Sequence, residues 1–155
     1  MHWELIFKIA NNGVLIFWLL LAFGPRGTMW LRGIFLGGSG LLALTYSVLI
    51  IGLLTGGLNG GAGGNGETPN FTSLSGVMAL FDTPGGATIG WIHYLAFDLF
   101  VGIWIARNAD RRVIGRIWQV PALALTLMFG PMGLLSYLVL RSFVGKNLEN
   151  AFTPR

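Results

Sequence analysis

One stretch of this chain combines a long apolar run with side chains that are able to move a proton. Small, aliphatic and aromatic residues fill positions 87–106, but His93, Tyr94 and Asp98 interrupt them. Imidazole, phenol and carboxyl groups are among the usual general acids and bases of enzymes. We take these three residues as candidate catalytic residues and predict acid/base chemistry for the segment.

Helical periodicity places the three residues on two faces. At about 100° per residue, Trp91, Tyr94 and Asp98 share one stripe, whereas His93 falls about 140° away from Asp98. A direct His/Asp pair in one straight helix is therefore not expected, and such a pair would need a kink or another helix. The alternative is that one face packs in a bundle and the other meets an apolar ligand or lipid.

A carboxyl group in such a segment needs compensation. An ionised aspartate at the centre of a bilayer costs about 2.5–3.5 kcal/mol on insertion scales. Asp98 therefore stays protonated or pairs with a donor, for which Asn11 and Asn12 are the candidates. The alternative, that all three residues are only structural hydrogen-bond anchors, stays open.

A second set of candidate residues lies near the C-terminus, around Gly130-Pro131-Met132-Gly133. Pro131 cannot donate a backbone hydrogen bond, so we expect a kink that exposes a carbonyl group. Pro131 is predicted to line a substrate cavity. The other residues predicted to line it are Tyr137, Trp91, Asn11 and Asn12. A packing kink, and an interfacial role for Trp91, are the alternatives.

Several chemistries are excluded by the residues that the sequence lacks. The chain has no cysteine and two histidines, and it contains no GxxxxGK[ST], HExxH or GxSxG motif. We therefore predict no metal site and no cofactor. The net charge of +4 comes from basic residues scattered at the ends of apolar blocks, which does not favour nucleic acid as a partner.

The composition identifies the elements that must position these residues. Of 155 residues, 54% are apolar and only 10% are charged, and the mean hydropathy is +0.68, whereas soluble proteins are about a quarter charged. Four blocks approach the roughly 20 residues that span a bilayer. These are positions 5–23, 33–54, 87–106 and 118–140. We predict a single all-α domain, an integral membrane four-helix transmembrane bundle.

The connection between the second and third blocks has two predicted parts. Positions 56–70 are rich in glycine and are expected to form a flexible loop. Positions 73–81 carry apolar residues at helical spacing behind a hydroxyl residue, which predicts a short interfacial helix.

Lysine and arginine counts favour one orientation in the membrane. Six arginines follow the first and third blocks, and the opposite side has Lys8, Arg141, Lys146 and Arg155. The positive-inside rule then places both termini outside the cytoplasm.

Motifs spread along most of the chain resemble a known family. They are GWIHYLAFDLFVG at positions 90–102, SLSGVMALF at 73–81, FGPMGLL at 129–135, and Asn11, Trp18, Pro25, Arg26 and Arg141. In this order they resemble the neoxanthin-synthase-like, abscisic-acid-deficient family of plants and bacteria.

The resemblance implies a four-helix membrane protein of carotenoid metabolism. Plant members are associated with making neoxanthin from violaxanthin, in which an epoxide opens to an allene without net redox change. Asp98, Tyr94 and His93 would then be acid, hydrogen-bond donor and base. The Gly-rich insert is longer than expected of the family, and no transit peptide precedes the first block, so we expect a bacterial inner membrane and a carotenoid other than violaxanthin.

Three other functions stay open at this level. The chain could be a non-catalytic carotenoid-binding or assembly subunit, working as a homo-oligomer or with a carotenoid enzyme as partner. It could cleave carotenoids with a metal supplied from outside the recognised ligands. It could also be a small proton-coupled transporter, because an intramembrane acid often serves as a proton relay.

Overall fold

The computed structural model describes residues 2–61 and 69–144, and these ranges consist of helices joined by loops. The helices are α1 (Trp3–Phe23), α2 (Thr28–Ile34), η1 (Phe35–Gly40), α3 (Leu41–Leu54), α4 (Leu74–Phe81), α5 (Pro84–Arg111), α6 (Arg116–Phe129) and α7 (Pro131–Val144). The π-helical segment η1 joins α2 to α3 in one continuous helix. The all-α prediction is confirmed for the described ranges.

Three helices are long and apolar enough to cross a membrane: α1, the continuous helix Thr28–Leu54, and α5. They contain the first three predicted blocks and extend beyond them, most clearly where positions 87–106 become the 28-residue α5. At 1.5 Å per residue, the 14-residue helices α6 and α7 are each about 21 Å long. That is short of the roughly 30 Å of a hydrocarbon core.

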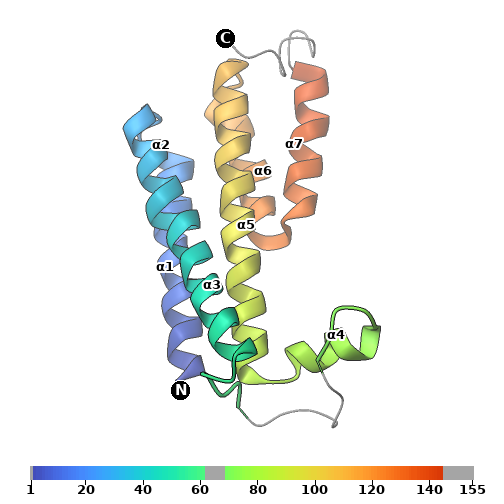
Figure 1. Cartoon of the computed structure of the whole chain (residues 1–155). Helices are drawn as coiled ribbons and strands as arrows, with labels where there is room; N and C mark the ends of the chain where they lie inside the picture. The colour runs from blue at the N-terminus through green and yellow to red at the C-terminus, as the bar shows by residue number, and fades with distance from the viewer. Residues whose placement is uncertain (1, 62–68, 145–155) are drawn as a thin grey trace.

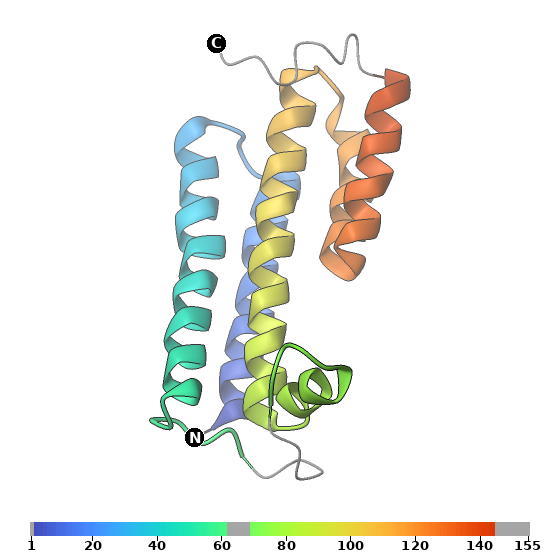
Figure 2. The ribbon, with the colours of Figure 1, turned by 45° about the vertical axis from the view of Figure 1, so that its right-hand side comes forward.

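The prediction of a fourth continuous span at positions 118–140 is wrong. The chain reverses at Gly130, whose φ of +42° is unfavourable for residues with a side chain. Pro131 then begins α7, because its fixed φ suits the first position of a helix. The expected kink is therefore a complete reversal, and α6 and α7 form a hairpin that lies beside one half of α5 (Figures 1 and 2).

Helix α5 is the centre of the molecule (Figure 1). Thirteen of its 28 residues are buried, compared with four of 21 in α1. It packs against α1, α3, α6 and α7. Its N-terminus is fixed by Thr83, whose hydroxyl accepts a hydrogen bond of 3.0 Å from the Gly86 N–H.

Glycine allows the continuous helix to approach α5 closely. A Cβ atom on Gly38 in η1 would lie 2.5 Å from Cδ2 of Leu99 in α5. Such close backbone approach is how helices associate where lipid gives no hydrophobic driving force.

The short helix predicted at positions 73–81 is confirmed as α4. Ser73 is its N-cap and accepts a hydrogen bond of 3.1 Å from the Gly76 N–H. The ring of Phe81 fills the space beside Gly90 of α5, which fixes α4 to the start of that helix. The Gly-rich loop predicted at positions 56–70 lies partly outside the described residues.

The hairpin changes the expected placement of the chain ends. Helix α1 begins at one end of the molecule, and α7 ends at the other, beside the end of α5 (Figure 1). The described part of the chain therefore does not support the prediction that both termini share one side. The described basic residues now divide seven to one, with Lys8 alone in the N-terminal half of α1 and seven at the opposite end: Arg26, Arg32, Arg107, Arg111, Arg112, Arg116 and Arg141. We call the latter the arginine-rich end; Lys146 and Arg155 lie outside the described residues.

Candidate functional site

Asp98 lies in the middle of α5 and faces the turn of the α6/α7 hairpin. Its side chain is buried, with 7% exposed. A Cβ atom on Gly130 would lie 2.5 Å from Asp98 Oδ1, so the carboxyl group is in contact with the backbone of the turn. Its other oxygen, Oδ2, is buried and has no hydrogen-bond partner among the described residues.

The turn itself is held by short backbone contacts. The Gly130 N–H donates to the Thr126 carbonyl at 2.9 Å, and the Gly130 carbonyl accepts from the Gly133 N–H at 3.0 Å. Gly133 lies directly against the backbone of Thr126, where a Cβ atom would overlap the Thr126 nitrogen. Glycine at both positions therefore permits the tight reversal that brings the hairpin tip to Asp98.

Two opposing influences act on the Asp98 carboxyl group. Burial in an apolar bundle favours its protonated form. The positive end of the α7 dipole, which begins directly after Gly130, favours the ionised form.

The predicted stripe of Trp91, Tyr94 and Asp98 is present on α5. Tyr94 lies one turn before Asp98 on the same helix. The rings of Trp91 and Tyr94 stack with centroids 5.5 Å apart. Trp91 is 40% exposed, so an aromatic surface leads from the outside of the protein to the buried acid.

The asparagines of α1 do not pair with Asp98. Asn11 Oδ1 instead accepts a hydrogen bond of 3.0 Å from the Trp91 indole N–H, and Asn12 is exposed. The predicted Asn–Asp98 pairing is wrong for both residues within the described chain. Asn11 contributes to the site only by orienting Trp91.

His93 lies on a different face of α5 from Asp98, as the helical period predicts. Its ring contacts Tyr46 of α3 and Phe97, with centroids 5.2 and 4.7 Å away. The structure therefore does not bring His93 and Asp98 together.

Tyr137 also lies away from Asp98. Its hydroxyl donates a hydrogen bond of 2.6 Å to Asn108 Oδ1, and its ring meets Trp104 edge-on. Asn108 is ten residues beyond Asp98, about 15 Å further along the helix. Of the two residues predicted near the C-terminus, only Pro131, beside Gly130 at the hairpin tip, is adjacent to the Asp98 region.

Two residues of this region were not predicted as part of the site. Gly130 was noted only as part of a kink, although a Gly-Pro pair in an apolar block is a signal of a reversal. Trp18 of α1 is buried, with an indole N–H that has no partner in the described part of the chain. Its ring lies against Gly102, one turn beyond Asp98, and the only sequence signal for Trp18 is its place in the family resemblance.

A separate polar cluster holds the arginine-rich end together. Arg26 forms an ion pair of 3.3 Å with Asp110 of α5, and Gln119 of α6 donates to the same carboxyl group at 2.9 Å. Burial lowers the pKa of Arg26, and the Asp110 carboxylate raises it back in part. This cluster joins the α1–α2 loop, α5 and α6, and its role is structural.

No three histidine, aspartate or glutamate side chains gather into a candidate metal site within residues 2–61 and 69–144. Two groups in the Asp98 region can transfer a proton: the Asp98 carboxyl group and the phenol of Tyr94, one turn away. The surrounding surface is aromatic and apolar, which suits an apolar substrate.

Comparison with known proteins gives one match. The ABA4-like family model, described as ABA DEFICIENT 4-like, matches residues 5–137. The match contains most of α1, all of α2 to α6 and the first half of α7, and so it includes Asp98 and the hairpin turn. No curated protein and no solved structure matches the chain.

Proposed function

Because this chain belongs to the ABA4-like family, whose members act in carotenoid and xanthophyll metabolism, we propose that it is a membrane-embedded isomerase of a carotenoid end ring. The observation that carries the proposal is the position of Asp98. Its buried carboxyl group faces the tip of a hairpin beside an exposed aromatic surface, and one of its oxygens has no hydrogen-bond partner among the described residues.

A single carboxyl group suffices for the isomerisation of an epoxide to an allene. Protonated Asp98 gives its proton to the epoxide oxygen as the bond from that oxygen to the ring carbon next to the polyene breaks. The ionised carboxylate then takes the proton from the neighbouring polyene carbon, and the electrons of that C–H bond form the new double bond. The product has the same atoms as the substrate, and Asp98 ends protonated as it began.

Tyr94 is assigned as a hydrogen-bond donor beside the carboxyl group. Its position one turn before Asp98, on the same stripe of α5, supports this assignment. His93 receives no catalytic role in this proposal, because it packs between Tyr46 and Phe97 on another face of α5.

The polyene is proposed to lie along the apolar surface around the hairpin tip. Phe129 and Met132, which flank the turn, are 52% and 57% exposed, and Trp91 is 40% exposed. In a membrane these side chains face hydrocarbon, so a carotenoid dissolved in the bilayer reaches Asp98 without entering water. Aromatic rings and thioether groups provide favourable contacts for a conjugated chain.

A non-catalytic carotenoid-binding or assembly subunit is the second candidate function. One observation favours it: Asp98 fits closely against Gly130, which is what a structural anchor of the hairpin would do. The two candidates differ in what they require of the Asp98 proton, because an anchor needs only the shape and polarity of the group.

Pigment analysis in a carotenoid-producing host tests the proposal. Strains making violaxanthin or other epoxidised carotenoids are compared by chromatography with and without the chain. A new isomer of unchanged mass is the expected result. Unchanged profiles in every carotenoid background, with the protein present in the membrane, would contradict enzymatic activity and leave the binding subunit as the better account.

The proposed location is a bacterial inner membrane with the arginine-rich end in the cytoplasm. The seven-to-one division of the described basic residues supports this orientation through the positive-inside rule.

A further inference from the structure

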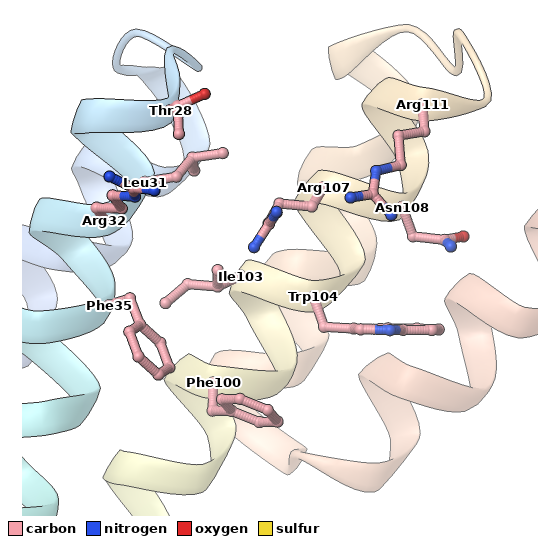
Figure 3. Close-up of a pocket in the computed structure, with 10 residues that line it drawn as sticks. All are labelled: Thr28, Leu31, Arg32, Phe35, Phe100, Ile103, Trp104, Arg107, Asn108 and Arg111. Atoms are coloured by element: carbon pink, nitrogen blue, oxygen red, sulfur yellow. The ribbon is translucent and has the colours of Figure 1, made fainter. Parts of the chain in front are cut away.

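A cavity of about 520 Å³ lies between α2, η1 and α5, close to the arginine-rich end. Figure 3 shows Arg32 of α2 and Arg107 of α5 on its two sides, with Arg111 one turn further along α5. Phe35 and Phe100 line the part nearer the middle of the molecule. The cavity is thus cationic at one end and aromatic at the other, and its volume is typical of ligand sites.

The cavity is separate from the candidate carotenoid site. Its α5 residues Phe100 and Trp104 belong to the helical stripe of His93, not to that of Asp98. A ligand bound there would not touch the Asp98 carboxyl group.

Two other arginines at the same end, Arg26 and Arg116, have protein partners for their guanidinium groups. Arg26 is paired with Asp110 at 3.3 Å, and Arg116 donates to the Gly24 carbonyl at 2.9 Å. By contrast, no hydrogen bond or ion pair joins the guanidinium groups of the cavity arginines to any described residue; these arginines are Arg32, Arg107 and Arg111.

Placing these positive charges close together is unfavourable unless an anion binds between them. Arg107 and Arg111 are four residues apart on one helix face, where like charges repel. Arg32 adds a third positive charge from across the cavity, and none of the residues that line the cavity is acidic. Guanidinium groups bind phosphate oxygens in bidentate fashion, which makes phosphate the fitting anion.

We propose that this cavity binds the phosphate headgroup of an anionic phospholipid, whose acyl chain runs along the aromatic end. Phe35, Phe100 and Trp104 are 42%, 49% and 38% exposed and provide an apolar surface that a soluble phosphate would leave uncovered. Basic pockets between membrane helices on the cytoplasmic side are known to recognise anionic headgroups.

Lipid titration of the purified full chain tests this proposal. The protein in detergent is titrated with phosphatidylglycerol or phosphatidylcholine, and bound lipid is measured by native mass spectrometry. We expect preferential binding of phosphatidylglycerol. Each of the changes Arg107→Gln and Arg111→Gln should weaken its binding about fivefold, and the pair about 25-fold, since a basic residue near a membrane surface contributes about 1 kcal/mol.

Matched variants and a competitor complete the test. Lys8→Gln removes one positive charge near the opposite end and should leave binding unchanged, and Arg32→Gln should repeat the loss if the double variant does not fold. Equal binding of both lipids, or an equal loss in Lys8→Gln, would overturn the proposal. Displacement of the lipid by an equal concentration of inorganic phosphate would also overturn it, because the site would then recognise phosphate without the acyl chain. Pigment conversion plays no part in these measurements, so the two proposals fail independently.

Discussion

Asp98 and Gly130 come from different helices, yet a methyl group on Gly130 would lie 2.5 Å from Oδ1 of Asp98. The acid at the middle of the central helix and the tip of the α6/α7 hairpin therefore define each other's position. A change in either residue is expected to affect the site through the other, and this contact can be tested in two ways.

Replacing the carboxyl group tests its role in proton transfer. Asp98→Asn keeps the size and hydrogen-bonding capacity of the side chain but cannot ionise. We expect carotenoid conversion to fall about 10²- to 10⁴-fold, the usual contribution of a general acid or base, while the protein inserts and folds. Chromatography of pigments, normalised to the amount of membrane protein, measures this. Asp82→Asn, at the exposed end of α4, is the control and should be silent. Full activity of Asp98→Asn would favour the binding subunit.

Adding a methyl group to the hairpin turn tests the contact from the other side. Gly130→Ala puts a side chain at φ +42° and against Asp98. We expect a loss of about 1–3 kcal/mol in unfolding free energy, seen as a lower melting temperature in detergent. Gly13→Ala is the control, because a Cβ atom there has no neighbour within 4 Å and should stabilise α1 slightly. Combining Gly130→Ala with Asp98→Ala should recover part of the loss, because the second change removes the carboxyl group that the new methyl group meets. An unchanged melting temperature of Gly130→Ala alone would show that the turn does not have this conformation.

The assignment of His93 to packing gives a third prediction. His93→Phe keeps a ring between Tyr46 and Phe97 but removes the imidazole base. Pigment conversion should stay close to that of the parent protein. A loss as large as that predicted for Asp98→Asn would instead make His93 part of the catalytic group, and would require a substrate that reaches two faces of α5.

The course of the chain through the membrane can be tested by labelling, because the sequence has no cysteine of its own. Single cysteines at Glu4 and Ser142 should react with an impermeant thiol reagent from opposite sides. A cysteine at Val113, which is 90% exposed between α5 and α6, should react from the same side as Ser142. If Glu4 and Ser142 reacted from one side, the last two helices would have to be a single span.

The ion pair at the arginine-rich end gives a prediction about stability alone. Asp110→Asn leaves the Arg26 guanidinium, whose side chain is 9% exposed, without its counter-ion. We expect a loss of about 1–3 kcal/mol in unfolding free energy and no direct effect on chemistry. Melting temperature in detergent, compared with Asp82→Asn, checks this. Equal melting temperatures of the two variants would mean that the pair contributes no more than an exposed charge.

Local sequence patterns were enough to identify most helical segments and the unusual polar residues within them. Apolar run length identified three spans, and a hydroxyl N-cap with apolar residues at helical spacing identified α4. The period of 3.6 residues per turn was enough to separate His93 from the stripe of Tyr94 and Asp98. The position of a helix and the face on which each of its residues lies depend only on local geometry. Residues close together in the sequence are therefore enough to predict them.

Contacts between residues far apart in the sequence could not be predicted in this way and became visible in the folded chain. Hydropathy counts apolar residues without regard to chain direction, so positions 118–140 satisfied the rule for a span even though the chain reverses at Gly130. The same holds for the Asn11 amide, which bonds to Trp91 and not to Asp98, and for Arg32, which meets Arg107 and Arg111 across a cavity. Such contacts depend on how helices far apart in sequence pack together, and the period of a single helix cannot specify that.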